Sequence, residues 1–277
     1  ERDVVASRGG GMGVVFQGVT VAVGGTTVLS EVDLDIGPGE HVAVVGASGA
    51  GKSSLLGVLL GWHEVRDGAL RVDDQAVTAA SVPGLREQIA WVEPGVQLWN
   101  RTLAENLTYG CDDADPDELV AAAGLQRVVH HLPGGVATRL GEGGALVSGG
   151  EGQRVRFGRG LGRGQARLVL LDEPFRGLDR TTRRELLDRA RARWRHATIL
   201  SVTHDVLDTT DVARVVVVHD GRVVEDGPPE VLRQRPDGVY ARMLADAAEV
   251  DRMLWHDPGW RRWWLAEGQL AEGWDQP

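Results

Sequence analysis

The stretch that decides the fold is Gly46-Ala47-Ser48-Gly49-Ala50-Gly51-Lys52-Ser53. It fits in full the pattern G-x-x-x-x-G-K-[ST] of a phosphate-binding loop, or P-loop. An apolar run over residues 41–45 precedes it and a helical pattern over 52–60 follows, which predicts a strand, a glycine-rich loop and a helix. In that order the backbone N–H groups of the loop and the positive end of the helix point at phosphate oxygens. We expect residues 46–54, Ser54 included, to bind the phosphates of a nucleotide, with Lys52 at the β and γ phosphates and the Ser53 hydroxyl on magnesium.

The composition singles out the same loop. Lys52 is the only lysine in the sequence, and every other basic residue is an arginine. Lysine is a compact point charge on a flexible stem, whereas arginine is a planar fork, so the two do not exchange freely among phosphate oxygens. A chain that otherwise uses arginine therefore keeps lysine where the phosphate chemistry requires it.

Composition and charge exclude several classes of protein. The chain has 277 residues, of which 42% are hydrophobic and 25% charged, which is typical of a folded globular protein. Its formal net charge of −10 argues against a nucleic acid partner, because phosphate backbones need a basic surface. A single cysteine, Cys111, cannot close a disulfide within the chain, so a cytoplasmic location is the default. No apolar run is long enough to span a membrane, and the start at Glu1 suggests a piece of a longer protein.

Alternating and continuous apolar runs predict the order of strands and helices. Hairpins are predicted over 14–36 and 69–77, and buried strands over 41–45, 88–92, 168–171, 198–202 and 215–219, with an edge hairpin strand at 222–224. The region of about 96–165 is predicted to be helical, with helices over 116–123, capped by Asp115, and over 150–162. The charged stretch 180–195 predicts an exposed crossover helix.

Carboxylates follow one of these buried strands. The run Leu168-Val169-Leu170-Leu171-Asp172-Glu173 has the arrangement of a Walker B motif. Asp172 would end the strand beside the P-loop, where it can join the magnesium shell. Glu173 would point the other way and accept a proton from an attacking water. His204 follows the strand over 198–202, at the same edge of the sheet, and is the candidate for sensing a γ-phosphate.

One further motif relates the chain to a family. The segment Val147-Ser148-Gly149-Gly150-Glu151-Gly152-Gln153-Arg154 is similar to the signature L-S-G-G-Q-x-Q-R of ATP-binding cassette transporters, and the chain resembles their nucleotide-binding domain over about residues 14–240. The resemblance implies an α/β fold: a P-loop NTPase core of a mixed sheet with an antiparallel β subdomain, plus the inserted helical subdomain. It implies that Ser148, Gly149 and Gly150 cap the ATP of a second copy in a head-to-tail dimer, that Asp179 belongs to the D-loop and that His204 is the switch histidine. ATP and Mg²⁺ are the cofactors it implies.

Two segments resemble exporters in particular. Residues 132–144 look like L-P-x-G-x-x-T-x-x-G-E-x-G, and residues 98–107 resemble L-F-x-x-T-I-x-E-N-I. In exporters these segments contact transmembrane domains, which are fused ahead of the cassette or form a separate subunit. The resemblance therefore implies transmembrane partners and a position on the cytoplasmic face of the membrane.

The sequence also departs from the family at several positions. Val23 stands where an aromatic residue stacks on adenine, and Pro94 stands at the Q-loop glutamine, where Glu93 or Gln97 is a candidate substitute. Glu151 replaces the signature glutamine and adds negative charge. Four glycines in the signature helix should each weaken it by about 1 kcal/mol relative to alanine: Gly152, Gly158, Gly160 and Gly162.

These observations divide the chain and leave competing functions. Residues 1–13 are predicted to be a linker, 14–240 the nucleotide-binding domain and 241–277 a tail that contains Trp255, Trp260, Trp263, Trp264 and Trp274. The tail either packs on its own domain or anchors a partner. The leading hypothesis is an ATPase that dimerises around ATP and powers export. The alternative is a degenerate regulatory subunit of a heterodimeric transporter, which Val23, Pro94 and Glu151 favour. A soluble cassette ATPase acting on nucleic acid is a third, disfavoured by the charge.

Overall fold

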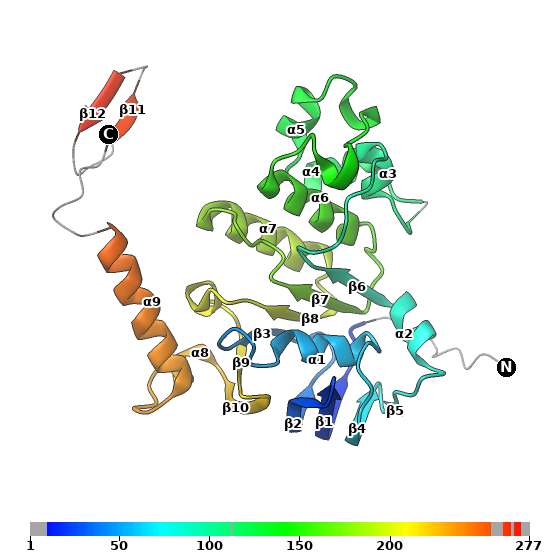
Figure 1. Cartoon of the computed structure of the whole chain (residues 1–277), viewed down its shortest axis with the longest axis vertical. Helices are drawn as coiled ribbons and strands as arrows, with labels where there is room; N and C mark the ends of the chain where they lie inside the picture. The colour runs from blue at the N-terminus through cyan, green and yellow to red at the C-terminus, as the bar shows by residue number, and fades with distance from the viewer. Residues whose placement is uncertain (1–9, 112, 256–262, 267–268, 273–277) are drawn as a thin grey trace.

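The centre of the fold is a six-stranded mixed sheet (Figure 1). This computed structural model describes residues 10–111, 113–255, 263–266 and 269–272. The sheet has the order β10-β9-β3-β8-β7-β6 and is built from β3 (His41–Val45), β6 (Ile89–Val92), β7 (Leu168–Asp172), β8 (Thr198–Val202), β9 (Arg214–His219) and β10 (Arg222–Gly227). Neighbours from β9 to β6 are parallel, and β10 pairs antiparallel with β9. The buried strands predicted from apolar runs are confirmed.

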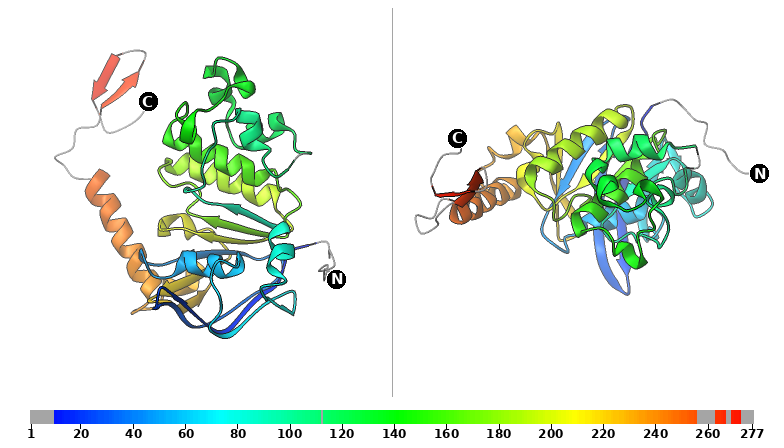
Figure 2. Two further views of the ribbon diagram at one scale, coloured as in Figure 1. Left: turned by 45° about the vertical axis from the view of Figure 1, so that its right-hand side comes forward. Right: turned by 90° about the horizontal axis from the view of Figure 1, so that it is seen from above.

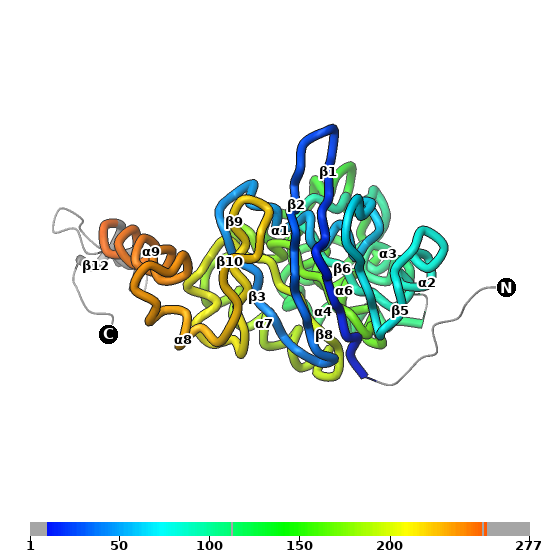
Figure 3. Tube along the Cα trace, turned by 90° about the horizontal axis from the view of Figure 1, so that it is seen from below, coloured from blue at the N-terminus to red at the C-terminus, as the bar shows by residue number. Residues whose placement is uncertain are grey.

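An antiparallel sheet of four strands lies below the first, with the order β2-β1-β4-β5 (Figures 1 and 3). It comprises β1 (Val14–Val23), β2 (Thr26–Ile36), β4 (Asp67–Val72) and β5 (Gln75–Ala76). Buried and exposed residues alternate along β2, because one face of the hairpin packs inward and the other meets water. Both predicted hairpins are confirmed.

The two faces of the central sheet pack on different cores. Alternate strand residues, such as Val42 and Leu170, join a core with α1 (Lys52–Leu59) and the antiparallel sheet. The residues between them, such as Val169 and Ile199, pack against helices on the opposite face. The strands of a parallel sheet covered on both faces are continuous apolar runs, which explains why they could be predicted from the sequence.

The region between β6 and β7 is helical, as predicted. It contains α3 (Leu103–Leu107), α4 (Pro116–Ala122), α5 (Gln126–His131) and α6 (Gly149–Leu161). Asp115 accepts a hydrogen bond from the N–H of Asp117 and so caps α4 as expected. The short helices α2 (Val82–Glu87), α3 and α5 were not predicted, because fewer than two turns carry little periodicity. The α/β class, the mixed sheet with an antiparallel part and the helical insertion all agree with the sequence prediction.

The last glycines of α6 have a packing role that helix propensity alone misses. A Cβ on Gly160 would collide with Cγ2 of Val92 in β6, and a Cβ on Gly158 would come 2.6 Å from Cδ2 of Leu107 in α3. All three of the residues Val92, Leu107 and Gly158 are buried. Glycine therefore lets α6 approach β6 and α3 closely, which offsets the entropic cost of glycine in a helix.

The N-terminal segment is bonded to the fold from residue 10 onward, although its composition predicts a linker up to residue 13. The guanidinium of Arg167 donates to the carbonyls of Gly10 and Gly11, and the Thr198 hydroxyl donates to that of Met12. Met12 itself is fully buried. Residues 1–9 lie outside the described residues.

The C-terminal elements are α7 (Arg180–Arg193), α8 (Pro229–Leu232), α9 (Val239–Trp255), β11 (Trp263–Ala266) and β12 (Gln269–Glu272). Helix α9 begins beside β10, where the Glu225 carboxylate accepts from the N–H groups of Val239 and Tyr240, and runs past residue 240 away from the sheets (Figures 1 and 2). No helix in the described part of the chain is long and apolar enough to cross a membrane. Trp260 and Trp274 lie outside the described residues.

Candidate active site

The P-loop connects β3 to α1 and wraps around the ammonium group of Lys52. Lys52 Nζ donates to the carbonyl oxygens of Gly46 and Ala47 at 2.9 and 2.8 Å, and the residue is 6% exposed. Burial lowers the pKa of Lys52, while the charges of Glu173 and Asp172 act in the opposite direction. The predicted order of strand, loop and helix is present, and both Walker B carboxylates lie within electrostatic reach of Lys52.

The backbone of the loop explains its glycines. Gly46, Gly49 and Gly51 have φ values of 152°, 78° and 105°, a region that favours glycine. A Cβ on Gly46 would collide with the carbonyl oxygen of Val218, and one on Gly51 would come 2.7 Å from that of Val28. In contrast, Ala47, Ser48 and Gly49 are exposed at the tip of the loop. The loop is thus anchored at its ends and open in the middle, where phosphate oxygens would approach the backbone.

Asp172 ends β7 next to the start of α1. Burial, the largest effect, and the charge of Glu173 raise the pKa of Asp172, while a hydrogen bond with the Ser53 side chain and the charge of Lys52 act in the opposite direction. A partly buried carboxylate whose charged form is penalised gains from a nearby cation. Ser53 and Asp172 therefore lie together as oxygen donors, and their binding of magnesium stays a prediction.

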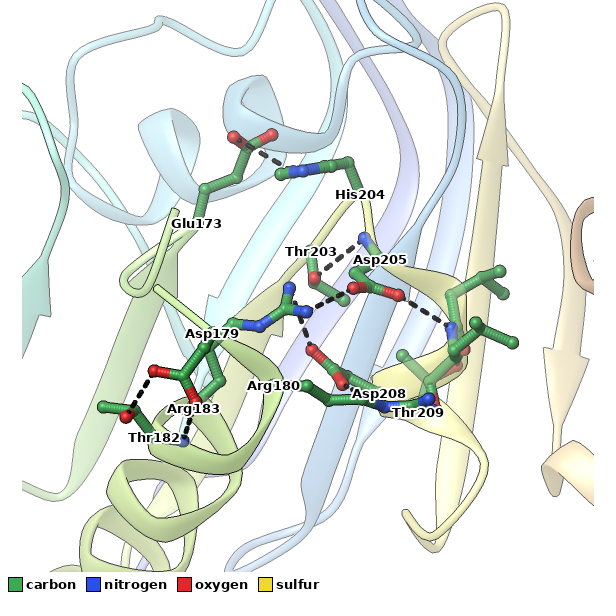
Figure 4. Close-up of polar contacts among 12 residues, drawn as sticks. Glu173, Asp179, Arg180, Thr182, Arg183, Thr203, His204, Asp205, Asp208 and Thr209 are labelled. Atoms are coloured by element: carbon green, nitrogen blue, oxygen red, sulfur yellow. Dashed lines mark hydrogen bonds and ion pairs between the residues drawn. The ribbon is translucent and has the colours of Figure 1, made fainter. Parts of the chain in front are cut away.

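Glu173 and His204 face each other across the ends of β7 and β8 (Figure 4). Glu173 Oε2 lies 3.3 Å from Nδ1 of His204, and the backbone N–H of Glu173 donates to Val202. Glu173 has a φ of 44°, a strained conformation for a residue with a Cβ. This turn directly follows β7 and places the Glu173 side chain against His204.

Glu93 directly follows the last residue of β6, and Asp172 is the last residue of β7. The two strands are parallel neighbours with Val92 paired to Leu171, so their ends lie together. Burial and the charge of Asp172 raise the pKa of Glu93, whose side chain is half-buried, whereas Gln97 is exposed. Of the two residues predicted to substitute at the Q-loop, Glu93 is the one placed beside Asp172.

The signature segment opens α6 on the helical part of the molecule. Ser148 is the N-cap of α6: its hydroxyl accepts from the N–H of Glu151, and the Glu151 carboxylate accepts from the N–H of Ser148. This capping box lowers the pKa of Glu151. The carboxylate that stands in place of the signature glutamine is therefore used to cap its own helix. Ser148 and Gly149 are exposed, and α6 lies on the far side of β6 and β7 from α1 (Figure 1). The structure does not bring the signature segment to its own P-loop.

Three more residues that the sequence singles out have clear positions: Asp179, Gly150 and Val23. Asp179 is the N-cap of α7 and accepts from the N–H and the hydroxyl of Thr182, which lowers the pKa of its carboxyl group. Gly150 lies close to Leu178, since a Cβ on this glycine would be 2.8 Å from Cδ2 of Leu178. Val23 ends β1 and is 45% exposed, which leaves an open apolar surface where the family has its aromatic residue.

A group of charges that sequence reasoning did not find lies between α7 and the loop that follows His204. Arg183 of α7 pairs with Asp205, the residue after His204, and with Asp208 three residues further along the chain (Figure 4). Charge patterning interpreted the whole stretch 180–195 as exposed, and nothing in the spacing of residues 183 and 205 indicates a contact. An arginine on the inner face of the predicted helix, beside Leu186, was the only available signal.

Curated relatives resemble the chain over most of its length. The mitochondrial "Iron-sulfur clusters transporter ATM1" of Candida albicans is 32% identical over 235 residues, which cover 82% of this chain and 31% of the relative. An "ATP-dependent lipid A-core flippase" of Ralstonia nicotianae is 36% identical over 82% of this chain and 39% of the relative. "ATP-binding cassette sub-family B member 6" of Homo sapiens is 34% identical over 79% and 26%. The chain thus spans about a third of the length of these relatives.

A solved structure and a family profile lead to the same assignment. The structure, described as "Structure of a bacterial Atm1-family ABC exporter with ATP bound", has a TM-score of 0.81 and 30% identity, covering 90% of this chain and 44% of that one. The profile of the family described as "ABC transporter" matches residues 29–176, more than half of the chain. The chain therefore belongs to the ABC transporter family.

Proposed function

We propose that the chain is the ATP-hydrolysing nucleotide-binding domain of an exporter. One observation carries the proposal: Lys52, the Ser53–Asp172 pair and the Glu173–His204 pair gather where β3, β7 and β8 end. Phosphoryl transfer needs a cradle for phosphate, donors for a metal and a base for water, and this edge of the sheet has a candidate for each. The family supports ATP as the nucleotide.

The residues suit ATP with magnesium. Lys52 would exchange its two carbonyl partners for oxygens of the β and γ phosphates, and the N–H groups of residues 46–54 would hold the remaining oxygens. Ser53 and Asp172 would hold Mg²⁺, which when bound offsets the negative charge of the phosphates. Glu173 would accept a proton from the attacking water, while His204 orients Glu173 through Nδ1 and contacts the γ-phosphate.

A second copy of the domain would complete each site. Ser148, Gly149 and Gly150 lie at the positive end of α6, away from the P-loop of the same chain. Gly149 is exposed and Gly150 is partly exposed, so their N–H groups are the available donors, since that of Ser148 is bonded to Glu151. A head-to-tail dimer would place these donors over the γ-phosphate bound by the partner, with the exposed Asp179 at the interface between the copies.

Transmembrane domains would be the other partner. The matched segment covers 31%, 39% and 26% of the three relatives. Two of them are named as a transporter and a flippase, which supports export as the purpose of hydrolysis. These domains would be fused to the chain or form a separate subunit, and the cassette would sit at the cytoplasmic face of the membrane. The segments 98–107 and 132–144 would contact them.

A second candidate is a regulatory cassette that binds ATP while its partner hydrolyses it. Val23 and Pro94 favour it, because the first offers no aromatic surface to adenine and the second no amide to magnesium and water. Glu151 does not favour the regulatory cassette, because its carboxylate belongs to the capping box of α6. The Glu173–His204 contact favours the enzyme.

Magnesium-dependent ATP hydrolysis by the chain and by Glu173→Gln tests the proposal. We expect the parent to hydrolyse ATP and the variant to lose hydrolysis but retain ATP in a stable dimer, measured by light scattering after gel filtration. Glu230→Gln, an exposed change on α8, is the matched control and should keep parental activity. ATP binding without hydrolysis above background in the parent would contradict the enzyme and favour the regulatory cassette.

A further inference from the structure

The loop over residues 203–209, called here the switch segment, is attached to α7 by ion pairs (Figure 4). Arg183 Nη2 lies 2.6 Å from Oδ2 of Asp205, and Nη1 lies 3.2 Å from Oδ2 of Asp208. Arg180 Nε lies 3.8 Å from the other oxygen of Asp208. One planar guanidinium thus spans two carboxylates that flank a single turn of the switch segment, a geometry that lysine cannot reproduce.

These charges are largely removed from water. The side chains of Arg183 and Asp208 are 18% and 6% exposed, and burial together with Asp205 raises the pKa of Asp208. An ion pair in this environment is costly to break, because the remaining charge stays buried without a partner. The arrangement is therefore more than a solvated surface pair, which contributes little.

Apolar packing holds one side of the switch segment, where Val206 is buried, but the side that faces α7 is less tightly packed. A small cavity of about 60 Å³ borders Thr203, His204 and Asp208 on one side and Arg183 and Leu187 of α7 on the other. No residue of 46–53 lines it. The buried Val206 therefore anchors the segment to the core, while the directional ion pairs of Arg183 fix the side of the segment that faces α7.

The same turn of α7 carries Asp179. The N–H of Arg183 donates to the carbonyl of Asp179, whose side chain caps the helix through Thr182. At the other end of the network, the N–H of Asp205 donates to the hydroxyl of Thr203, and Asp205 adjoins His204. A displacement at the start of α7 therefore reaches His204 through one arginine.

We infer that Arg183 is a positioning residue that holds His204 against Glu173 and couples it to the start of α7. The inference rests on the proposed function, because it concerns the same site. Arg183 itself touches neither Glu173 nor the P-loop by any contact among the described residues, so its effect passes through Asp205 and the switch segment.

The histidine signal of His204 provides a test that does not need hydrolysis. In the purified chain with ¹³C-labelled histidine, Arg183→Met should shift and broaden the ring signal of His204, assigned with His204→Asn, and leave that of His219 on β9 unchanged. Arg183→Lys should give an intermediate signal, because an ammonium group can pair with one carboxylate at a time. Arg127→Met removes the same charge from an exposed position on α5, outside this network, and is the matched control.

Kinetics test the same inference in the active protein. Arg183→Met should lower kcat by about tenfold or more with the KM for ATP changed by less than about twofold, since the P-loop is untouched. Asp205→Asn breaks the network from the other side and keeps Arg183 paired with Asp208, so it serves if Arg183→Met does not fold. A folded variant with an unchanged His204 signal, or with a loss of ATP affinity instead of kcat, would overturn the inference. An inactive parent would contradict the proposed function alone, since the histidine signal would still decide the role of Arg183.

Discussion

At the scale of single residues, the site depends on where the chain has lysine and where it has arginine, although both carry one positive charge. Lys52 lies among carbonyl oxygens in a loop whose ends have no room for added atoms, while Arg183 lies where its guanidinium bridges two carboxylates. The acceptors around each position therefore explain why residue 52 is a lysine and residue 183 an arginine. Sequence alone could identify Lys52, because the loop motif and the lysine count agree.

Lys52→Arg should therefore behave like a loss of function, not like a conservative change. The planar guanidinium does not fit between the carbonyls of Gly46 and Ala47, and its atoms would displace phosphate oxygens. We expect ATP affinity to fall by tenfold or more, which corresponds to about 1.4 kcal/mol, in fluorescent-nucleotide titration. Arg222→Lys, in an exposed pair with Glu31, is the reciprocal exchange and should leave affinity unchanged. Equal binding by Lys52→Arg and the parent would rule out this explanation of the single lysine.

Glu93 is the second residue whose role the structure sharpens. Because it lies beside Asp172 and is half-buried, a cation would relieve the repulsion between the two carboxylates. Glu93→Ala should raise the magnesium concentration needed for half-maximal hydrolysis, whereas Gln97→Ala, an exposed change, should not. Unchanged magnesium dependence in both variants would mean that the position of the Q-loop glutamine has no substitute. The sequence left the two residues open, since their relation to Asp172 depends on the pairing of β6 with β7.

At the level of helices and strands, prediction succeeded for the apolar strands and for α1, α4, α6 and α7. It missed α9, a helix of 17 residues that begins in the predicted domain and continues into the predicted tail. The parallel strands are continuous apolar runs, and α4, α6 and α7 have caps or several turns of periodicity. The helices α2, α3, α5 and α8 are too short for that signal. Sequence reasoning interpreted the glycines of α6 only through helix propensity. Their close neighbours come from β6 and α3, and nothing in the sequence of α6 itself indicates those contacts.

Gly160→Ala should destabilise the domain although alanine is the better helix former. The added Cβ would meet Cγ2 of Val92, which is buried and stiff at χ1, so we expect the free energy of unfolding to fall by about 1–3 kcal/mol in urea titration. Gly84→Ala in α2, where a Cβ meets nothing within 4 Å, is the matched control and should be neutral or stabilising by up to about 1 kcal/mol. Combining Gly160→Ala with Val92→Ala should cost less than the sum of the two changes. Additive effects would show that the contact is not the cause.

Over the whole molecule, the two sheets and the helical part meet around residues that come from distant points of the chain. The overall class was predictable, because motifs and strand order specify a P-loop core. The connections between the parts were not, since they join residues separated by more than a hundred positions, such as Arg167 with Gly10 and Thr198 with Met12. Glycine-rich composition at the N-terminus suggested a linker, but bonds from the central sheet fix its last residues.

Arg167 tests how far this N-terminal attachment contributes to stability. Its guanidinium bonds the carbonyls of Gly10 and Gly11 and pairs with Asp73 at 2.7 Å, and its side chain is 10% exposed. Arg167→Met leaves Asp73 largely buried without its partner, so we expect the free energy of unfolding to fall by about 3–5 kcal/mol. Asp73→Asn with Arg167→Met should recover part of that loss, because the stranded charge is gone. Arg71→Met, on the exposed side of β4, is the control. If Arg167→Met costs no more than Arg71→Met, residues 10–13 are held by the burial of Met12 and not by the arginine.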